Sequence, residues 1–222
     1  MKSIDLSTTS SIDFESTLGD NAYGKLAVVS GVPRITIDGN AAMPQLLRAH
    51  FVRPLPDVKV KGGEVRIRYP RYSLLNWLVY WRQPLAEITI NASIPWIIEL
   101  RGGVSSFAAD LRQVQLSGLD LRGGISHLWA NLPEPAGTVI IRVGGGVSDM
   151  TIHRPESIPL EIQVRGGIGS LTLDKQHFGA MGNRTRLKTP GYRDAINRYD
   201  IQISGGVSNI SIDKQALVNQ IS

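Results

Sequence analysis

The chain has 222 residues, of which 42% are hydrophobic, 23 are glycine and none is cysteine. This composition provides enough apolar surface for a packed core, and it excludes global disorder, disulfide bonds and thiolate metal sites. The formal charge of +5 is a mild excess that does not by itself indicate a nucleic-acid-binding protein.

Residues 1–20 are predicted to form a polar tail or a loose first strand. They lack the apolar segment of a signal peptide, and no stretch of the chain approaches the ~20 apolar residues of a transmembrane helix. We therefore expect a cytoplasmic or membrane-peripheral protein by default. Residues 21–222 contain no linker composition, so we expect them to form one domain.

The N-terminal half carries imperfect copies of a pattern that becomes clear later in the chain. Apolar or alternating runs at 25–29, 57–61, 65–68 and 87–90 predict short strands. The phrase GVPRITID, which begins at Gly31, matches the last copy of the pattern at five of eight positions.

Residues 46–82 are basic and aromatic, with eight Lys and Arg residues against two acidic ones, a local net charge of +6. Basic flanks around a Trp- and Leu-rich centre suit a protein partner, self-association or an anionic membrane surface, and nucleic acid is the least favoured ligand. The structural alternative is that the segment covers the side or end of the domain. The predicted binding residues here are Arg66, Arg68, Tyr69, Arg71, Tyr72, Trp77, Tyr80, Trp81 and Arg82.

Five near-copies of one unit follow. Each has an alternating strand, a Gly-Gly corner and a second strand with apolar residues at positions two, five and seven of the phrase. Successive corners are 21, 22 and 21 residues apart, and the last follows after 39. The corner glycines are Gly102, Gly103, Gly123, Gly124, Gly145, Gly146, Gly166, Gly167, Gly205 and Gly206.

A fixed period of this kind predicts an all-β solenoid with about 21–22 residues per repeat. One unit cannot bury its inner face alone, whereas stacked units form a continuous apolar interior. Glycine permits the backbone angles of the corner. Stacking also places equivalent residues in columns, and the predicted outer column contains Asp110, Asn131, His153, Asp174 and Asp213.

The longer interval before the last corner predicts an insertion at about 176–199. Its basic residues lie among glycine, asparagine and proline, and could bind phosphate or an acidic glycan; the alternative is a solvated loop. Residues 214–221 are predicted to form a short helix that caps the stack. The predicted binding residues of the insertion are Arg184, Arg186, Lys188 and Arg193.

No sequence pattern indicates catalysis, since the metal-binding, nucleophile and phosphate-loop motifs are all missing. We therefore expect no catalytic residues, no metal site and no cofactor. Asp110, Asp174 and Lys175 could be nominated for a carbohydrate-cleaving site, so a carbohydrate-binding or carbohydrate-active solenoid is the alternative function.

The GG[VI]S phrases, together with Ala92-Ser93-Ile94-Pro95-Trp96, resemble the putative-adhesin or toast-rack domains over about residues 25–215. These domains are related to the C-terminal part of bacterial cell-wall-active antibiotic response proteins. The resemblance implies a right-handed, single-stranded β-solenoid without catalytic residues. We expect a non-catalytic bacterial binding or assembly module, associated with the cell envelope, that binds a protein or a second copy. A membrane-peripheral regulator of envelope stress is a further alternative.

Overall fold

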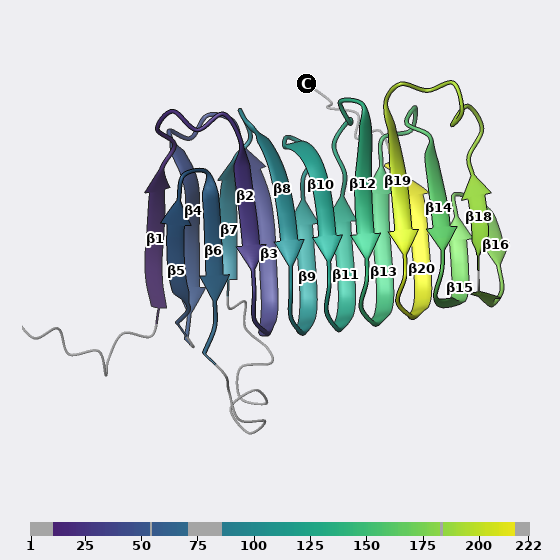
Figure 1. Ribbon diagram of the computed structural model, residues 1–222, viewed down its shortest axis with the longest axis horizontal. Coiled ribbons are helices and arrows are strands. Elements are labelled where there is room, and N and C mark those ends of the chain that lie inside the picture. Colours follow the sequence, from purple (N-terminus) through teal and green to yellow (C-terminus); the bar gives the residue numbers. More distant parts are fainter. Residues whose placement is uncertain (1–10, 54, 71–85, 183, 216–222) are drawn as a thin grey trace, which may run out of the picture.

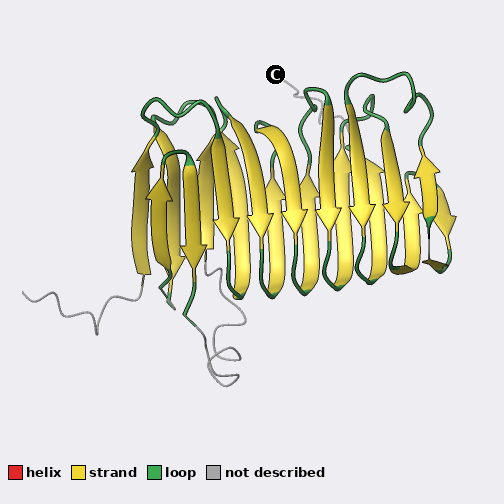
Figure 2. Ribbon diagram, in the orientation of Figure 1, coloured by secondary structure: helices red, strands yellow, loops and turns green. Residues whose placement is uncertain are grey.

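The computed structural model describes residues 11–53, 55–70, 86–182 and 184–215, which form two long sheets and no helix (Figures 1 and 2). Sheet A contains, in spatial order, β1 (Ser11–Thr17), β4 (Gln45–Val52), β7 (Ala86–Asn91), β3 (Val32–Asn40), β9 (Val104–Asp110), β11 (Ile125–Asn131), β13 (Val147–Arg154), β20 (Val207–Lys214), β15 (Gly167–Leu173) and β16 (Gln176–Phe178), with β17 (Met181–Gly182) also beside β15. Sheet B contains β18 (Thr185–Lys188), β14 (Leu160–Val164), β19 (Arg198–Ile203), β12 (Thr138–Val143), β10 (Gln115–Leu121), β8 (Pro95–Leu100), β2 (Gly24–Val28), β6 (Glu64–Arg68) and β5 (Asp57–Lys61).

The two sheets are connected by rungs, each a strand of sheet B followed by a strand of sheet A. The rungs whose connection is described throughout are β2–β3, β8–β9, β10–β11, β12–β13, β14–β15 and β19–β20, and β6 and β7 follow the same order. Strands of neighbouring rungs pair in parallel, whereas the strands at both ends of the stack, such as β1–β4 and β14–β18, pair antiparallel. The all-β prediction is confirmed, with a parallel middle and antiparallel ends.

The apolar core lies between the two sheets and is formed by the predicted alternating positions. In the β10–β11 rung, Ile125, Leu128 and Ala130 are all at most 3% exposed. Ile125 pairs with Val147 and His127 with Asp149, which leaves Ser126 outside the ladder. Ser148 of β13 is skipped in the same way, so the two strands stay in register while the parity that faces inward changes.

The two glycines of each corner have different roles. A Cβ on Gly123 would lie 1.9 Å from the carbonyl oxygen of Gly102, and one on Gly145 would lie 1.8 Å from that of Gly123. In contrast, a Cβ on Gly124 or Gly146 would meet no atom within 4 Å. The first glycine is therefore required by the close approach of successive corners, and the second is not.

The last rung of the chain lies inside the stack (Figure 1). Strand β19 pairs with both β12 and β14, and β20 pairs with both β13 and β15. The predicted insertion contains β16–β18 and the return path to this internal position. In the outer column, Asp213 pairs with His153, and Asp174 lies beyond it, so the order departs from chain order.

A buried ion pair links the two sides of the inserted rung. Arg154, at the end of β13, is 2% exposed and donates hydrogen bonds to Asp174, after β15, at 2.8 and 3.0 Å. Arg154 also donates to the carbonyl oxygen of Ile158 at 2.7 Å. Because β20 lies between β13 and β15, this pair fastens the strands on either side of it.

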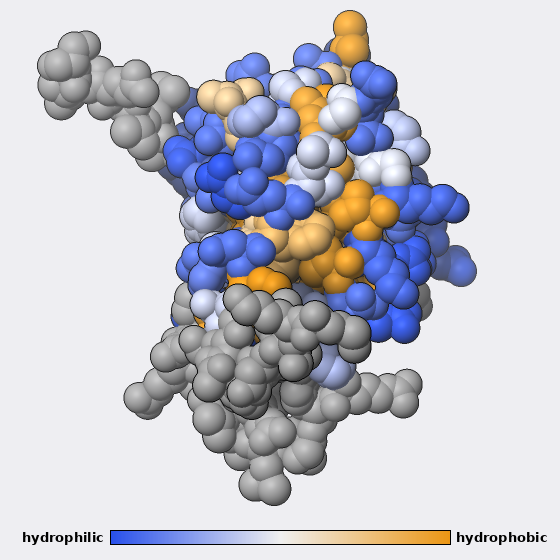
Figure 3. Space-filling model, turned by 90° about the vertical axis from the view of Figure 1, so that its left-hand side faces the viewer, coloured by the Kyte–Doolittle hydropathy of each residue, from blue (hydrophilic) through white to orange (hydrophobic). Residues whose placement is uncertain are grey.

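The apolar core continues to the β1–β5 end of the stack. Figure 3 shows hydrophobic side chains at the centre of that end and hydrophilic ones around them. Phe14 of β1 and Val58 of β5 pack against the core, while Ile12 and Val60 are exposed. The predicted C-terminal cap lies outside the described residues, apart from its first two.

Candidate functional site

The predicted basic and aromatic segment is described only in part. Arg71, Tyr72, Trp77, Tyr80, Trp81 and Arg82 lie outside the described residues. Arg66 and Arg68 are exposed on β6, and Arg66 donates to Glu64 at 3.0 Å. Tyr69 does not lie at the surface as expected for a binding residue: it is 2% exposed and packs edge-on against Phe51, with ring centroids 6.5 Å apart.

The basic residues of the insertion divide into two groups. Arg184 and Arg186 lie together at the start of β18, beside β14. Lys188 forms an ion pair with Glu161 at 3.4 Å and lies over the ring of Tyr192. Arg193 is exposed in the following turn. The first group lines a concave surface.

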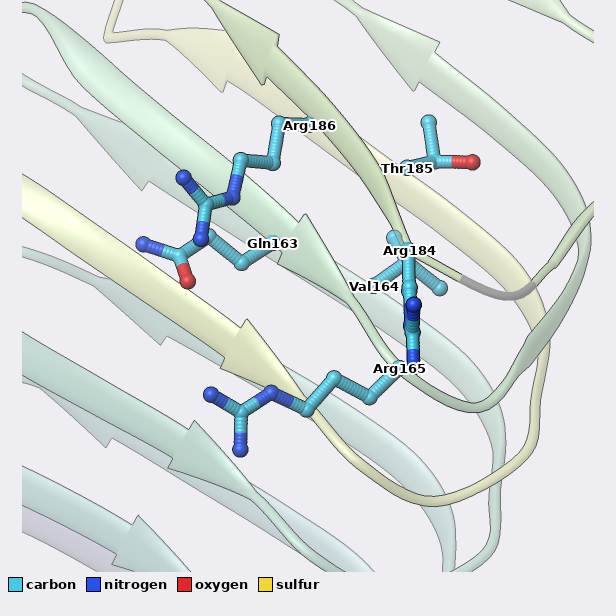
Figure 4. Close-up of a pocket in the computed structure, with 6 residues that line it drawn as sticks. All are labelled: Gln163, Val164, Arg165, Arg184, Thr185 and Arg186. Carbon is cyan, nitrogen blue, oxygen red and sulfur yellow. The ribbon is translucent and has the colours of Figure 1, made fainter.

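That surface is a hollow of about 620 Å³ at the ends of β14 and β18, which we call the arginine hollow. In the β14–β18 pair, Gln163 lies opposite Arg186, and their side chains lie close together in Figure 4. Arg184, with a φ of 72°, donates its backbone N–H to Val164 at 2.9 Å. The hollow is lined by Gln163, Val164, Arg165, Arg184, Thr185 and Arg186.

The guanidinium groups of this hollow lack carboxylate partners among the described residues. The central rungs differ, because Arg101 pairs with Glu99 at 2.7 Å and Arg122 with Asp120 at 2.6 Å. In both pairs the acid stands two residues before the arginine, on the same face of the strand. At the equivalent position before Arg165 the chain has Gln163, which cannot neutralise the charge.

A row of basic and amide side chains runs along the outer face of sheet B as far as Asp120, which lies beside Arg142. By strand register, Arg142 lies beside Gln202, which lies beside Gln163, which lies beside Arg186. Glu161, two residues before Gln163, is 5% exposed; it accepts one hydrogen bond from Gln163 at 3.0 Å and forms an ion pair with Lys188. This carboxylate is engaged, so the row presents positive charge and amide groups.

Arg165 and Gln163 were missed by sequence reasoning because they belong to a repeat copy and not to the insertion. A signal was available in the sequence. The copies that contain Arg101 and Arg122 both read acid-x-Arg-Gly-Gly at the corner. The copy that contains Arg165 reads Gln-x-Arg-Gly-Gly. Loss of the acid from a repeated pair leaves the corner arginine without a carboxylate two residues earlier.

Among the described residues, no three His, Cys, Asp or Glu side chains are placed to hold a metal ion. Within the same residues, no helix has the length and apolarity needed to cross a bilayer. The arrangement can bind charged groups through hydrogen bonds and ion pairs.

Residues 7–153 match the family described as "N-terminal domain of toast_rack, DUF2154". The crystal structure of a putative cell adhesion protein from Clostridium sporogenes is similar, with a TM-score of 0.71 and 23% identity over 92% of this chain and 99% of that one. None of the curated proteins matches the chain.

Two more distant structures do not superpose closely on this fold. A putative adhesin from Bacteroides fragilis has a TM-score of 0.30 and 10% identity over 91% of this chain and 95% of that one. A putative lipid binding protein from Parabacteroides distasonis has a TM-score of 0.24 and 11% identity over 93% and 96%.

The family match covers more than half of the chain, and it includes the Gly-Gly corners of the central rungs. The arginine hollow lies beyond residue 153, outside the matched region. Together with the shared fold, the match confirms the resemblance seen in the repeated phrases: the chain belongs to the toast-rack family.

Proposed function

We propose that this protein is a non-catalytic binding module that recognises a polyanionic ligand through the arginine hollow. The observation that carries the proposal is the set of three arginines, Arg165, Arg184 and Arg186, around one hollow without a carboxylate partner among the described residues. Guanidinium groups bind phosphate and carboxylate in a bidentate manner, so phosphate-bearing or acidic polymers fit best.

Three broader expectations from the sequence accompany this function: the solenoid winding, the cell-envelope association and the self-association. The parallel pairing of the central rungs is compatible with the right-handed, single-stranded winding that the family resemblance implies. An association with the cell envelope would supply anionic polymers and anionic lipid headgroups as ligands. Self-association through Trp77 and Trp81 stays a prediction, because both residues lie outside the described part of the chain.

The test measures binding of two probes, inorganic polyphosphate and vesicles of phosphatidylglycerol, by calorimetry and co-sedimentation. We expect binding to at least one probe that weakens as salt is added, because exposed charges are screened. Binding to polyphosphate alone identifies a soluble phosphate polymer, and binding to vesicles alone identifies a lipid surface.

The double variant Arg165→Gln/Arg186→Gln should weaken binding by about tenfold or more, because charged hydrogen bonds are the strong ones. Arg68→Gln is the matched control, since Arg68 is also exposed on the same sheet but lies at the other end of the stack. Equal weakening by Arg68→Gln would move the ligand to the N-terminal basic segment. An unchanged affinity in the double variant contradicts the arginine hollow as the binding site.

A further inference from the structure

Trp129 occupies a position that the other rungs fill with small side chains. On the outer face of sheet A it lies between Ala108 of β9 and Thr151 of β13. The same row continues with Thr36, Ser211 and Thr172. Since these rungs stack without a large residue there, packing of the fold does not account for a tryptophan at this position.

The environment of Trp129 is that of a binding residue. Trp96 is fully buried, and its indole N–H donates to the carbonyl oxygen of Asn91 at 2.6 Å. Trp129 is 38% exposed, and its N–H has no hydrogen-bond partner among the described residues. It therefore presents both ring surface and a hydrogen-bond donor to the outside.

Polar side chains surround the ring on this flat face. His127 and Asn131 lie two residues away on the same strand, and therefore on the same face. The His153 ring lies 6.1 Å from the Trp129 ring at an angle of 66°. His127 pairs with Asp149 at 3.3 Å, and Asp149 also accepts a hydrogen bond from Asn209 at 2.9 Å.

This arrangement is not a hydrophobic docking patch, because the residues next to the ring are polar or small. It combines one aromatic surface with several planar hydrogen-bonding groups, as sites for polar organic ligands do. The electron-rich face of an indole attracts the positively polarised C–H groups of a sugar ring. Amide, imidazole and carboxylate groups at its edge can bind the hydroxyls.

We propose that the face of sheet A around Trp129 is a glycan-binding site. A pyranose ring stacks on the indole, its hydroxyls bond to Asn131 and the His127–Asp149 pair, and the chain extends over the small side chains of Ala108 and Thr151. The site lies on the sheet opposite the arginine hollow and requires no charge on its ligand. It is therefore a second activity, independent of anion binding.

The test titrates the protein with cellotetraose, chitotetraose, maltotetraose and mannotetraose by calorimetry. We expect at least one tetrasaccharide to bind in the millimolar range or better. Trp129→Ala should lower that affinity by about tenfold or more, and Trp129→Tyr should retain most of it, because tyrosine keeps a stacking surface. Both variants should fold, since the side chain lies outside the core.

Tyr23→Ala is the matched control, because Tyr23 is an exposed aromatic residue (62%) away from this face, and its loss should leave glycan binding unchanged. Arg165→Gln/Arg186→Gln should also leave it unchanged, which separates this site from the anion-binding one. The proposal is overturned if no tetrasaccharide binds, or if Trp129→Ala binds as well as the wild-type protein.

Discussion

The central and C-terminal rungs of sheet B have similar backbones and different outer charges. In the central rungs, each corner arginine is neutralised by an acid two residues earlier, as with Glu99 and Arg101. In the C-terminal rung, Gln163 replaces that acid and Arg165 lacks a carboxylate partner among the described residues. The difference teaches that one row of side chains can change the surface charge of a rung while the glycine corners maintain the fold.

If every corner along the stack approaches its neighbour as closely, the first glycine of each corner should be indispensable. Gly123→Ala places a Cβ within 1.9 Å of the Gly102 carbonyl oxygen, and we expect a loss of about 3 kcal/mol in the free energy of unfolding. Gly205→Ala should act similarly, because its Cβ would lie 1.9 Å from the Gly145 oxygen. Urea unfolding monitored by circular dichroism measures both.

The second glycine of the corner provides the control. Gly124→Ala meets no neighbouring atom within 4 Å, so its effect should be within about 0.5 kcal/mol. Equal losses of stability in Gly123→Ala and Gly124→Ala, whether large or small, would contradict close approach as the reason for glycine at the first position.

A smaller loss is expected at the ion pair that spans the inserted rung. Asp174→Asn leaves Arg154 buried without its counter-charge and should cost about 2 kcal/mol. Asparagine tolerates the positive φ of 53° at this position, so the change removes the charge and keeps the backbone. Urea unfolding measures the loss, and Asp213→Asn, in the neighbouring column position, serves as control. A stability equal to that of the wild type would mean that the ion pair does not fasten the inserted rung.

The acid that precedes the corner arginine can be added to the C-terminal rung and removed from a central one. Gln163→Glu recreates the acid-x-arginine pair at the C-terminal corner and should weaken polyphosphate binding by about tenfold. The converse change, Asp120→Asn, removes the partner of Arg122 and should add anion affinity to the central rungs. Calorimetry measures both, with thermal unfolding to confirm that each variant folds. Unchanged binding in both variants would contradict the role assigned to acid pairing.

The strands and corners could be predicted from the sequence because alternation and glycine act locally. The position of the last rung could not, since all copies present similar apolar faces. The apolar pattern of 207–214 alone does not distinguish a place beside β13 from one beyond β15. Tyr69 follows the inward parity of Val65 and Ile67. Its burial was therefore predictable, although the neighbouring aromatic residues favoured a surface role.

The proposed anion site could be predicted only in part. Arg184 and Arg186 stood out in the insertion, whereas Arg165 enters the hollow from a repeat copy and depends on β18 folding back beside β14. Trp129 was not identified from the sequence for a different reason. Its side chain alternates outward from a strand whose apolar residues otherwise mark the core, so hydrophobicity alone does not distinguish the two faces.

The internal place of β19–β20 has a consequence for how the protein is made. Residues 198–214 leave the ribosome after β14 and β15, yet they separate those strands from β12 and β13. The β14–β15 rung must therefore wait for β19 and β20, which follow it in the chain, before it joins the rest. This strand order also limits the addition of rungs by duplication. A repeat copied after residue 214 would begin in the interior of the stack, beside β20, and not at its end.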